Sequence, residues 1–240
     1  MKLIFGDFLK VGYQIPEKSV DMVLADPPYE VTKCKWDSII PLEPMWVELQ
    51  RIIKLNGAIV MTASQPFTSI LIMSNLKMFR YTWVYQKTTP TGYLNAKKMP
   101  MRVHEDVVVF YKKLPIYNPQ KTFNHKRKIS TANHKRNCKK TEVYGKHELA
   151  TYDSTERYPI SVQKFSTDKQ KSKLHSTQKP IALMKYFIKT YTNKGETVLD
   201  FAMGSGTTGD ACRELGRRFI GIDSDKLNFN IAKKRLYDPK

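Results

Sequence analysis

The sequence predicts an α/β fold built around one doubly wound, mostly parallel sheet. Strands and helices alternate along most of the chain, which is the pattern of strands joined by crossover helices. The run at residues 20–25 is almost continuously apolar, as is typical of a strand covered on both faces. With 240 residues, of which 41% are hydrophobic, the chain can bury a large core.

Residues 1–111 supply two predicted helices and five predicted strands. One helix is indicated where Met45, Leu49 and Ile52 recur at helical spacing, after Pro44 and before an Asn-Gly stop. The second helix is expected at residues 66–76. Short apolar runs predict strands at residues 2–5, 20–25, 58–62, 81–85 and 106–111.

Residues 174–240 repeat the alternation. Apolar residues mark one face of a helix that follows Pro180, and strands are expected at 197–200 and 218–222. Two further helices are expected at 207–215 and 225–236. Because the alternation resumes here, the stretch between the two parts is interpreted as an insertion into one fold.

The chain carries 41 Lys and Arg against 22 Asp and Glu, a net charge of +19. Residues 112–173 hold 16 basic and 5 acidic residues, so about a quarter of the chain carries more than half of the excess. Such an excess favours a polyanionic partner, for example nucleic acid. No apolar run approaches the ~18 residues of a membrane span, and the N-terminus does not resemble a signal peptide. We therefore expect a cytoplasmic protein without a membrane partner.

Residues 112–173 lack amphipathic periodicity and are predicted to form a basic insertion that contacts DNA phosphates. A solvated linker is the alternative, although a linker would be expected to mix charges of both signs. Aromatic residues such as Phe123 and Tyr158 lie between the basic ones. The expected DNA-binding residues are Lys126, Arg127, Lys128, Lys135, Arg136, Lys139, Lys140 and Arg157.

The three cysteines are odd in number and far apart, which fits a reducing compartment without a disulfide framework. His125, His134, Cys138 and His147 share one segment, but none of their spacings is that of a recognised zinc ligand pair. We therefore expect no bound metal.

Residues 198–208 predict a strand, a turn that contains Gly204 and Gly206, and the start of a helix. Such a turn lets a ligand approach the backbone at a helix N-terminus. Asp223 ends the following strand, where a carboxylate can accept hydrogen bonds from both hydroxyls of a ribose. Gly209 completes a dinucleotide-type spacing, so the turn alone leaves NAD, another nucleoside cofactor, or no ligand open.

The segment Asp26-Pro27-Pro28-Tyr29 directly follows the apolar strand at residues 20–25. The prolines lack an N–H and hold the chain extended, which leaves backbone carbonyls free as acceptors. A carboxylate and a carbonyl that converge on one point suit an amino group with two hydrogens, and Tyr29 offers a flat face for a base. Taken alone, the segment is better explained as a proline turn that closes a strand.

The segment does not stand alone. Together with the Gly-Ser-Gly-Thr-Thr turn and the His-Ser-Thr-Gln-Lys-Pro segment at 175–180, it resembles the amino-group DNA methyltransferases that use S-adenosylmethionine, and the motif order is similar to their β class. The resemblance implies a Rossmann-like, seven-stranded, circularly permuted sheet in which the 2–5 strand spatially follows the last helix. It also implies a catalytic domain at 1–111 and 174–240 and a target-recognition insertion at 112–173.

The resemblance assigns roles within the site. It implies that residues 26–29 are catalytic and that Asp7 lies near the cofactor adenine. Phe201, Ser176 and Asp223 depart from the residues that are usual in the family, which implies altered packing around the cofactor. The other cofactor-binding residues that it implies are His175, Ser176, Thr177, Lys179, Asp200, Phe201, Ala202, Gly204, Ser205, Gly206, Thr207, Thr208 and Asp223.

The implied reaction is methyl transfer to the N6 amine of adenine in duplex DNA, with the base flipped out of the helix. Asp26 favours adenine, and N4-methylation of cytosine is the alternative. An RNA or protein-glutamine methyltransferase is another possible function, but such enzymes would carry Asn-Pro-Pro. A DNA-binding module with a relict cofactor pocket is a further one, but it would not need Asp26 and Tyr29. Duplex DNA is the expected partner, while a homodimer and a cognate restriction endonuclease are left open. The loop at 88–104 is either a substrate gate or an ordinary exposed loop.

Overall fold

The computed structural model describes residues 1–29, 40–130, 152–166 and 178–237. The chain divides into two units, of which the larger comprises Met1–Asn118 and Ser161–Lys240 and the smaller comprises Pro119–Ile160. None of the helices in the described ranges combines the length and the apolar composition that a bilayer span requires.

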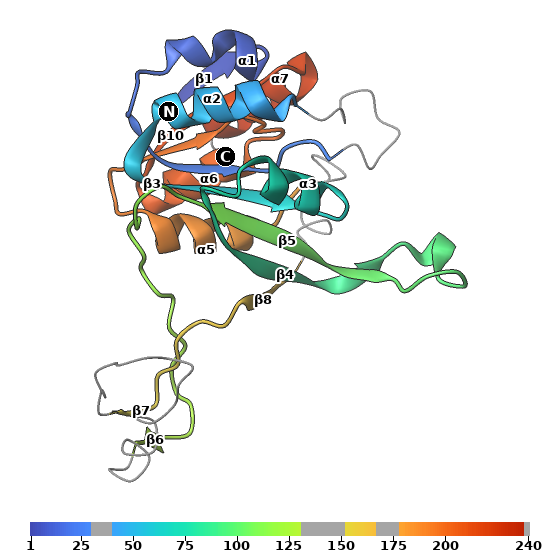
Figure 1. Ribbon diagram of the computed structural model, residues 1–240, viewed down its shortest axis with the longest axis vertical. Helices are drawn as coiled ribbons and strands as arrows, with labels where there is room; N and C mark the ends of the chain where they lie inside the picture. The colour runs from blue at the N-terminus through green and yellow to red at the C-terminus, as the bar shows by residue number, and fades with distance from the viewer. Residues whose placement is uncertain (30–39, 131–151, 167–177, 238–240) are drawn as a thin grey trace. The chain divides into compact units, whose positions relative to one another are not determined.

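The larger unit contains an eight-stranded sheet in which β5 runs antiparallel to its two neighbours and all other neighbouring strands are parallel (Figure 1). This architecture confirms the predicted α/β class. In spatial order the strands are β1 (Lys2–Phe5), β10 (Arg218–Asp223), β9 (Thr197–Asp200), β2 (Val20–Ala25), β3 (Ile53–Ala63), β5 (Arg102–Phe110), β4 (Phe79–Thr91) and β8 (Val162–Phe165).

The sheet has one strand more than the seven that the family resemblance implies. The additional strand is β8, which pairs in parallel with β4 and lies within the range expected for the basic insertion. It covers an edge of β4 whose backbone N–H and C=O groups would otherwise face solvent. The smaller unit, Pro119–Ile160, is therefore shorter at both ends than the predicted insertion at 112–173.

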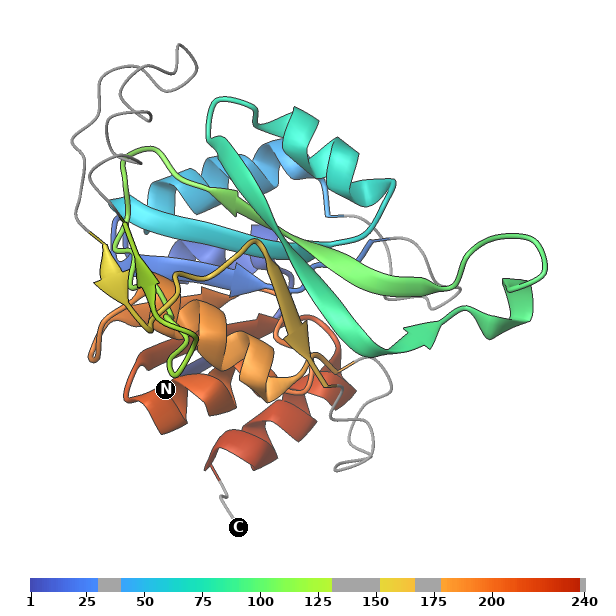
Figure 2. The same ribbon diagram turned by 90° about the horizontal axis from the view of Figure 1, so that it is seen from below.

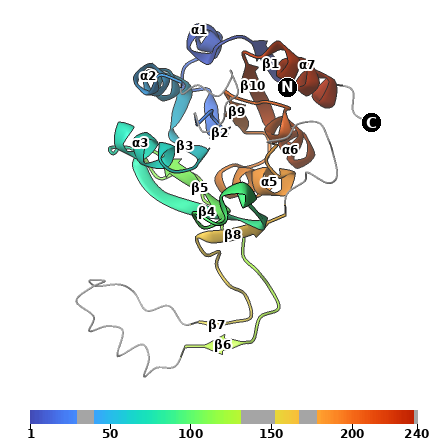
Figure 3. The same cartoon turned by 90° about the vertical axis from the view of Figure 1, so that its right-hand side faces the viewer.

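Two hydrophobic cores lie on opposite faces of the sheet, as expected for a doubly wound fold (Figure 3). Alternation along β2 sends Val23 and Ala25 to one core and Met22 and Leu24 to the other. The first core is covered by α1 (Phe8–Val11), α2 (Leu42–Ile52) and α3 (Phe67–Ser74), and the second by α5 (Ile181–Tyr191), α6 (Thr207–Leu215) and α7 (Lys226–Tyr237).

The predicted loop at 88–104 is mostly a β-hairpin. Strand β4 continues to Thr91 and β5 begins at Arg102, so only residues 92–101 connect them, with one short 3-10 helix (Tyr93–Asn95). Figures 1 and 2 show this hairpin extending beyond the rest of the sheet. A second 3-10 helix (Gly12–Gln14) follows α1.

Polar contacts join the described segments of the smaller unit. Strands β6 (Lys128–Ile129) and β7 (Asp153–Ser154) pair antiparallel, and Arg127 forms an ion pair with Asp153 at 2.6 Å. The guanidinium of Arg157 donates to the carbonyls of Lys126, Ser154 and Glu156. Of the predicted DNA-binding residues, Arg127 and Arg157 thus have partners within this unit, and Lys135, Arg136, Lys139 and Lys140 lie outside the described residues.

Candidate active site

A cavity of about 520 Å³ opens at the carboxyl ends of β2, β9 and β10. This edge of a doubly wound sheet is where such folds bind ligands, because the loops diverge there. One part of the cavity wall carries Asp26, Tyr29, Glu105 and Lys179, and other parts are formed by the glycine turn, by the residues around Asp7 and Asp223, and by residues of β4 and β5.

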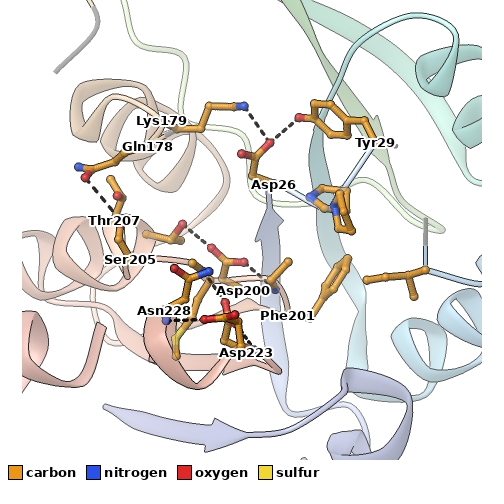
Figure 4. A pocket seen from close by; sticks show the side chains of 18 of the residues that line it. Asp26, Tyr29, Gln178, Lys179, Asp200, Phe201, Ser205, Thr207, Asp223 and Asn228 are labelled. Carbon is orange, nitrogen blue, oxygen red and sulfur yellow. Dashed lines mark hydrogen bonds and ion pairs between the residues drawn. The ribbon is translucent and has the colours of Figure 1, made fainter. Parts of the chain in front are cut away.

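Asp26 follows the last residue of β2 and lies among three donors. Tyr29 Oη donates to its Oδ1, and the Nζ atom of Lys179 lies 2.9 Å from the same oxygen (Figure 4). Thr62 Oγ1 also donates to this oxygen. All three contacts converge on Oδ1, which leaves Oδ2 as an acceptor for a further donor. The parallel register explains why Thr62 is close, since Ala25 is paired with Met61.

Tyr29 is held by contacts at its ring and at its hydroxyl. Its ring stacks on Phe67 with the centroids 5.4 Å apart, and its hydroxyl donates a hydrogen bond to Asp26. Burial, reinforced by the Asp26 charge, raises the pKa of Tyr29 well above its ordinary value. The phenol therefore stays protonated and donates to the carboxylate at physiological pH.

Lys179 is the centre of a buried charge network rather than a lone cation. Its Nζ atom lies 3.0 Å from Glu105 Oε2, and Glu105 Oε1 lies 2.5 Å from the Nζ atom of Lys87. Burial alone would lower the pKa of Lys179, but the Asp26 and Glu105 carboxylates outweigh it and raise that pKa well above its usual value. Burial likewise acts to raise the pKa of Glu105, but Lys179 and Lys87 outweigh it and lower that pKa. Lys179 and Glu105 therefore both stay charged near neutral pH.

The glycine turn has the backbone that the sequence predicts. Gly204 and Gly206 have φ values of +50° and +79°, which favour glycine because side chains with a Cβ are strained there. The Asp223 carboxylate accepts hydrogen bonds from the N–H groups of Gly204 and Asp225, both at 2.8 Å. Asp223 thus fixes the turn in addition to lining the cavity.

Gly209, the third glycine of the dinucleotide-type spacing, has a packing role. A Cβ at this position would lie 2.7 Å from the ring of Phe219 and 2.8 Å from a methyl group of Leu236. The glycine therefore permits close approach of α6 to β10, and its presence does not bear on which cofactor is bound.

Asp200 is a buried carboxyl group at the end of β9, with only 3% of its surface exposed. Thr208 Oγ1 donates to it at 2.6 Å and the Ala202 N–H at 3.1 Å. Burial outweighs both hydrogen bonds and raises the pKa of Asp200 to about 7. Its charge therefore changes within the physiological pH range.

An apolar wall lies beside these carboxylates. The Phe8 and Phe201 rings stack with their centroids 4.9 Å apart, and both residues line the cavity. Asp7 also lines the cavity, and its side chain accepts a hydrogen bond from the Leu9 N–H at the start of α1. The position that departs from the family pattern, Phe201, is thus anchored by Phe8.

The cavity brings together most residues expected from the sequence. Gly206 is not part of its lining, and His175, Ser176 and Thr177 lie outside the described residues. Thr62, Glu105 and Lys87 were not predicted from the sequence, although the neighbouring parallel strand ends near Asp26 and could have suggested Thr62. The predicted residues that line the cavity are Asp7, Asp26, Pro27, Pro28, Tyr29, Lys179, Asp200, Phe201, Ala202, Gly204, Ser205, Thr207, Thr208 and Asp223.

Comparison with known families identifies the family of the chain. The model of the N6/N4 DNA methylase family matches residues 20–234, which is most of the chain. The chain belongs to this DNA methylase family. The resemblance of the three sequence motifs to amino-group DNA methyltransferases is thereby confirmed.

The sequences of individual relatives of this DNA methylase align with nearly the whole chain. The type II methyltransferase M2.LlaDCHI of Lactococcus lactis subsp. cremoris is 29% identical, over 98% of this chain and 88% of that protein. The DNA adenine methyltransferase YhdJ of Escherichia coli K12 is also 29% identical, over 98% of this chain and 82% of its own length.

Solved structures of DNA methyltransferases have the same fold. The crystal structure of the M1.HpyAVI–SAM complex is 27% identical, covers 98% of this chain and 99% of that chain, and has a TM-score of 0.64. The cytosine-N4-specific PvuII DNA methyltransferase has a TM-score of 0.70 at 15% identity, over 99% of this chain and 86% of its own, and supports the fold alone.

Proposed function

We propose that this DNA methylase transfers a methyl group from S-adenosylmethionine to the exocyclic N6 amine of adenine in duplex DNA. The observation that carries the proposal is the arrangement at Asp26, where three donors occupy Oδ1 and Oδ2 remains an acceptor within the cavity. The adenine-specific relative YhdJ supports the choice of base. A serine in place of Asp26 would have favoured cytosine.

The cavity suits S-adenosylmethionine by its size and by the chemistry of its walls. A volume of about 520 Å³ lies within the range of small-molecule sites. The Asp200 and Asp223 carboxylates offer acceptors for the hydroxyl and ammonium groups of the cofactor, and Phe8 with Phe201 offers an apolar surface for its adenine. The M1.HpyAVI–SAM complex supports this assignment.

Asp26 prepares the amine of the base for attack. The lone pair of an exocyclic amine is delocalised into the ring, so the nitrogen is a weak nucleophile. Hydrogen bonds from its two N–H groups to Asp26 Oδ2 and to the carbonyl of Pro27 favour a pyramidal nitrogen, whose lone pair then points away from the ring. Alignment of this kind is worth about 7 kcal/mol or more.

The bound cofactor supplies a methyl group that is activated by the positive sulfur. The amine nitrogen forms the new N–CH₃ bond with its lone pair while the S–CH₃ bond breaks and its electron pair stays on sulfur as a thioether. The nitrogen then carries a positive charge and releases one proton. Asp26 does not need to be a strong base for this release, because a protonated aryl amine is acidic.

Access to the amine requires the adenine to leave the duplex, which costs a few kcal/mol. Stacking on Tyr29, typically worth ~1–3 kcal/mol per base, offsets part of this cost. The fixed ring of Tyr29, stacked on Phe67, supports such a platform because its orientation is set before the base arrives.

Target recognition is proposed for the basic segment at 112–173. In its described part, Lys126 and Lys128 are the predicted contacts for phosphates, while the partners of Arg127 and Arg157 within this unit favour a structural contribution from both. A homodimer and a cognate restriction endonuclease are further proposed partners; light scattering tests the first, and cleavage of unmethylated host DNA tests the second.

The test is the replacement of Asp26 by Ala and by Asn, with methylated nucleosides from duplex DNA measured by mass spectrometry. We expect N6-methyladenine from the wild-type protein, loss of turnover in both variants, and retained cofactor binding by calorimetry. Glu43→Gln, on the exposed side of α2, is the matched control and should remain active. N4-methylcytosine as the product, or turnover of Asp26→Ala within tenfold of wild type, would contradict the proposal.

A further inference from the structure

Four charged groups of alternating sign form a continuous network in the wall of the cavity. Asp26 lies beside Lys179, Lys179 beside Glu105, and Glu105 beside Lys87, at 2.9, 3.0 and 2.5 Å. They come from four parts of the chain that are distant in sequence: the end of β2, the residues before α5, and strands β5 and β4. The network therefore links Asp26 to the antiparallel side of the sheet.

The exposure of these groups distinguishes them from a surface ion pair. The side chains of Lys179, Glu105 and Lys87 are only 12%, 13% and 14% exposed. Removing such groups from water costs several kcal/mol per charge unless each is well paired, so every member depends on its neighbours. By contrast, the side chains of the ion pair between Lys185 and Glu214 are 28% and 47% exposed. The stability of this pair therefore depends little on its surroundings.

We propose that Lys179 is a positioning residue that fixes the orientation of the Asp26 carboxylate, and that Glu105 holds the Lys179 ammonium in place for this task. The inference rests on the methyl transfer proposed above and adds two residues to it. Sequence resemblance had suggested that Lys179 binds the cofactor.

The physical reason is the rotational freedom of a carboxylate. Rotation about the Cβ–Cγ bond of Asp26 would turn the carboxylate plane and move the second oxygen away from the amine, and hydrogen bonds from the hydroxyls of Tyr29 and Thr62 resist that rotation only moderately. An ammonium group at 2.9 Å adds a charge-assisted contact to Oδ1, so Oδ2 is the oxygen left for the amine.

Glu105 is needed because a lysine side chain is flexible. Four rotatable bonds let the Lys179 ammonium leave Asp26 for water, at a gain of side-chain entropy. The Glu105 carboxylate opposes this movement, and Lys87 on the next strand compensates the charge of Glu105. Removal of Glu105 should thus act through the same carboxylate as removal of Lys179, and the two effects should not add.

The experiment compares Lys179→Met, Glu105→Gln and the double variant with wild type, in single-turnover and steady-state methylation of duplex DNA. A misoriented catalytic group costs about 100-fold. We expect kcat to fall by about that factor in Lys179→Met and by about tenfold in Glu105→Gln. The double variant should resemble Lys179→Met, while KM for DNA and the calorimetric Kd for S-adenosylmethionine stay within about threefold of wild type. Lys185→Met removes a lysine from an exposed ion pair and should leave kcat unchanged.

Three results would overturn the inference: a kcat of Lys179→Met within threefold of wild type, a loss explained by weaker cofactor binding, or additive effects of the two substitutions. If Lys179→Met melts below the assay temperature, Lys179→Gln and Glu105→Gln decide by the same criteria. Wild-type protein that forms no methyladenine overturns the proposed function together with this inference, whereas an active wild type with an unimpaired Lys179→Met overturns the positioning role alone.

Discussion

The buried carboxyl group of Asp200 makes the folded protein sensitive to pH, and replacing it with Asn should remove that sensitivity. An Asn side chain can keep both contacts that Asp200 makes: its Oδ1 accepts from the Ala202 N–H and its Nδ2 donates to Thr208 Oγ1. The substitution thus changes the charge and leaves the shape and hydrogen bonds of the site almost unaltered.

The size of the effect follows from the raised pKa. Asp200 titrates near 7 in the folded protein, and an aspartate in the unfolded chain titrates near 3.9. Between these values the folded state holds a proton that the unfolded state has lost, so the free energy of unfolding falls by ~1.4 kcal/mol per pH unit as pH rises. Above pH 7 the full cost, about 4 kcal/mol, is present. Asp200→Asn should therefore be about 2–4 kcal/mol more stable than wild type at pH 8 and similar to it near pH 4.

The assay is urea unfolding of both proteins at pH 5, 6, 7 and 8, followed by circular dichroism. The difference in unfolding free energy should grow with pH up to about 7 and then level off. Asp153→Asn is the control, because a hydrogen bond from Arg127 lowers the pKa of this exposed carboxyl, so no stabilisation at alkaline pH is expected. A difference between Asp200→Asn and wild type that is the same at all four pH values would refute the reasoning.

Three further predictions concern the cofactor turn, the helix that follows it and the basic unit. Asp223→Ala should weaken S-adenosylmethionine binding by about 1–3 kcal/mol through lost hydrogen bonds, and unchanged affinity in calorimetry would count against the ribose assignment. Gly209→Ala should lower the free energy of unfolding by ~1–3 kcal/mol, since its Cβ would lie 2.7 Å from Phe219; a urea midpoint equal to wild type would contradict this. Replacing Lys126 and Lys128 with Gln should weaken binding to all duplexes and reduce the salt slope by roughly two, as measured by fluorescence anisotropy. Loss confined to one DNA sequence would instead indicate base reading.

Strand β2 shows why much of the fold could be predicted. Its six residues are apolar except Asp21 and are followed by Asp26-Pro27, so both the burial and the end of the strand are local properties of the sequence. Strand β8 shows the opposite case. Val162–Phe165 alternates between exposed and partly buried positions and is a strand only because the edge of β4 is available for pairing. Whether these residues form a strand is therefore determined by β4 and not by their own sequence.

The residues of the site likewise include some that have a local sequence signature and some that do not. Asp26 and Gly204 could be found because strand ends and positive-φ turns have local sequence signatures, and the family motifs contain both. The partners of Lys179 could not be predicted, because Asp26 and Glu105 lie far from Lys179 in the sequence. Glu105 lies in a strand of buried valines, where a charged residue gives no sign of the lysines that neutralise it.

The pairing of β1 with β10 constrains how the protein folds during synthesis. Lys2 pairs with Ile220, and the Gly6 N–H donates to the carbonyl of Asp223, so β1 finds its partner only after β2 to β9 have been synthesised. Contacts between such distant residues form slowly, and until β10 is made β9 exposes one edge. The cofactor end of the cavity therefore assembles last, and chains released before β10 should aggregate rather than persist as binding-competent fragments.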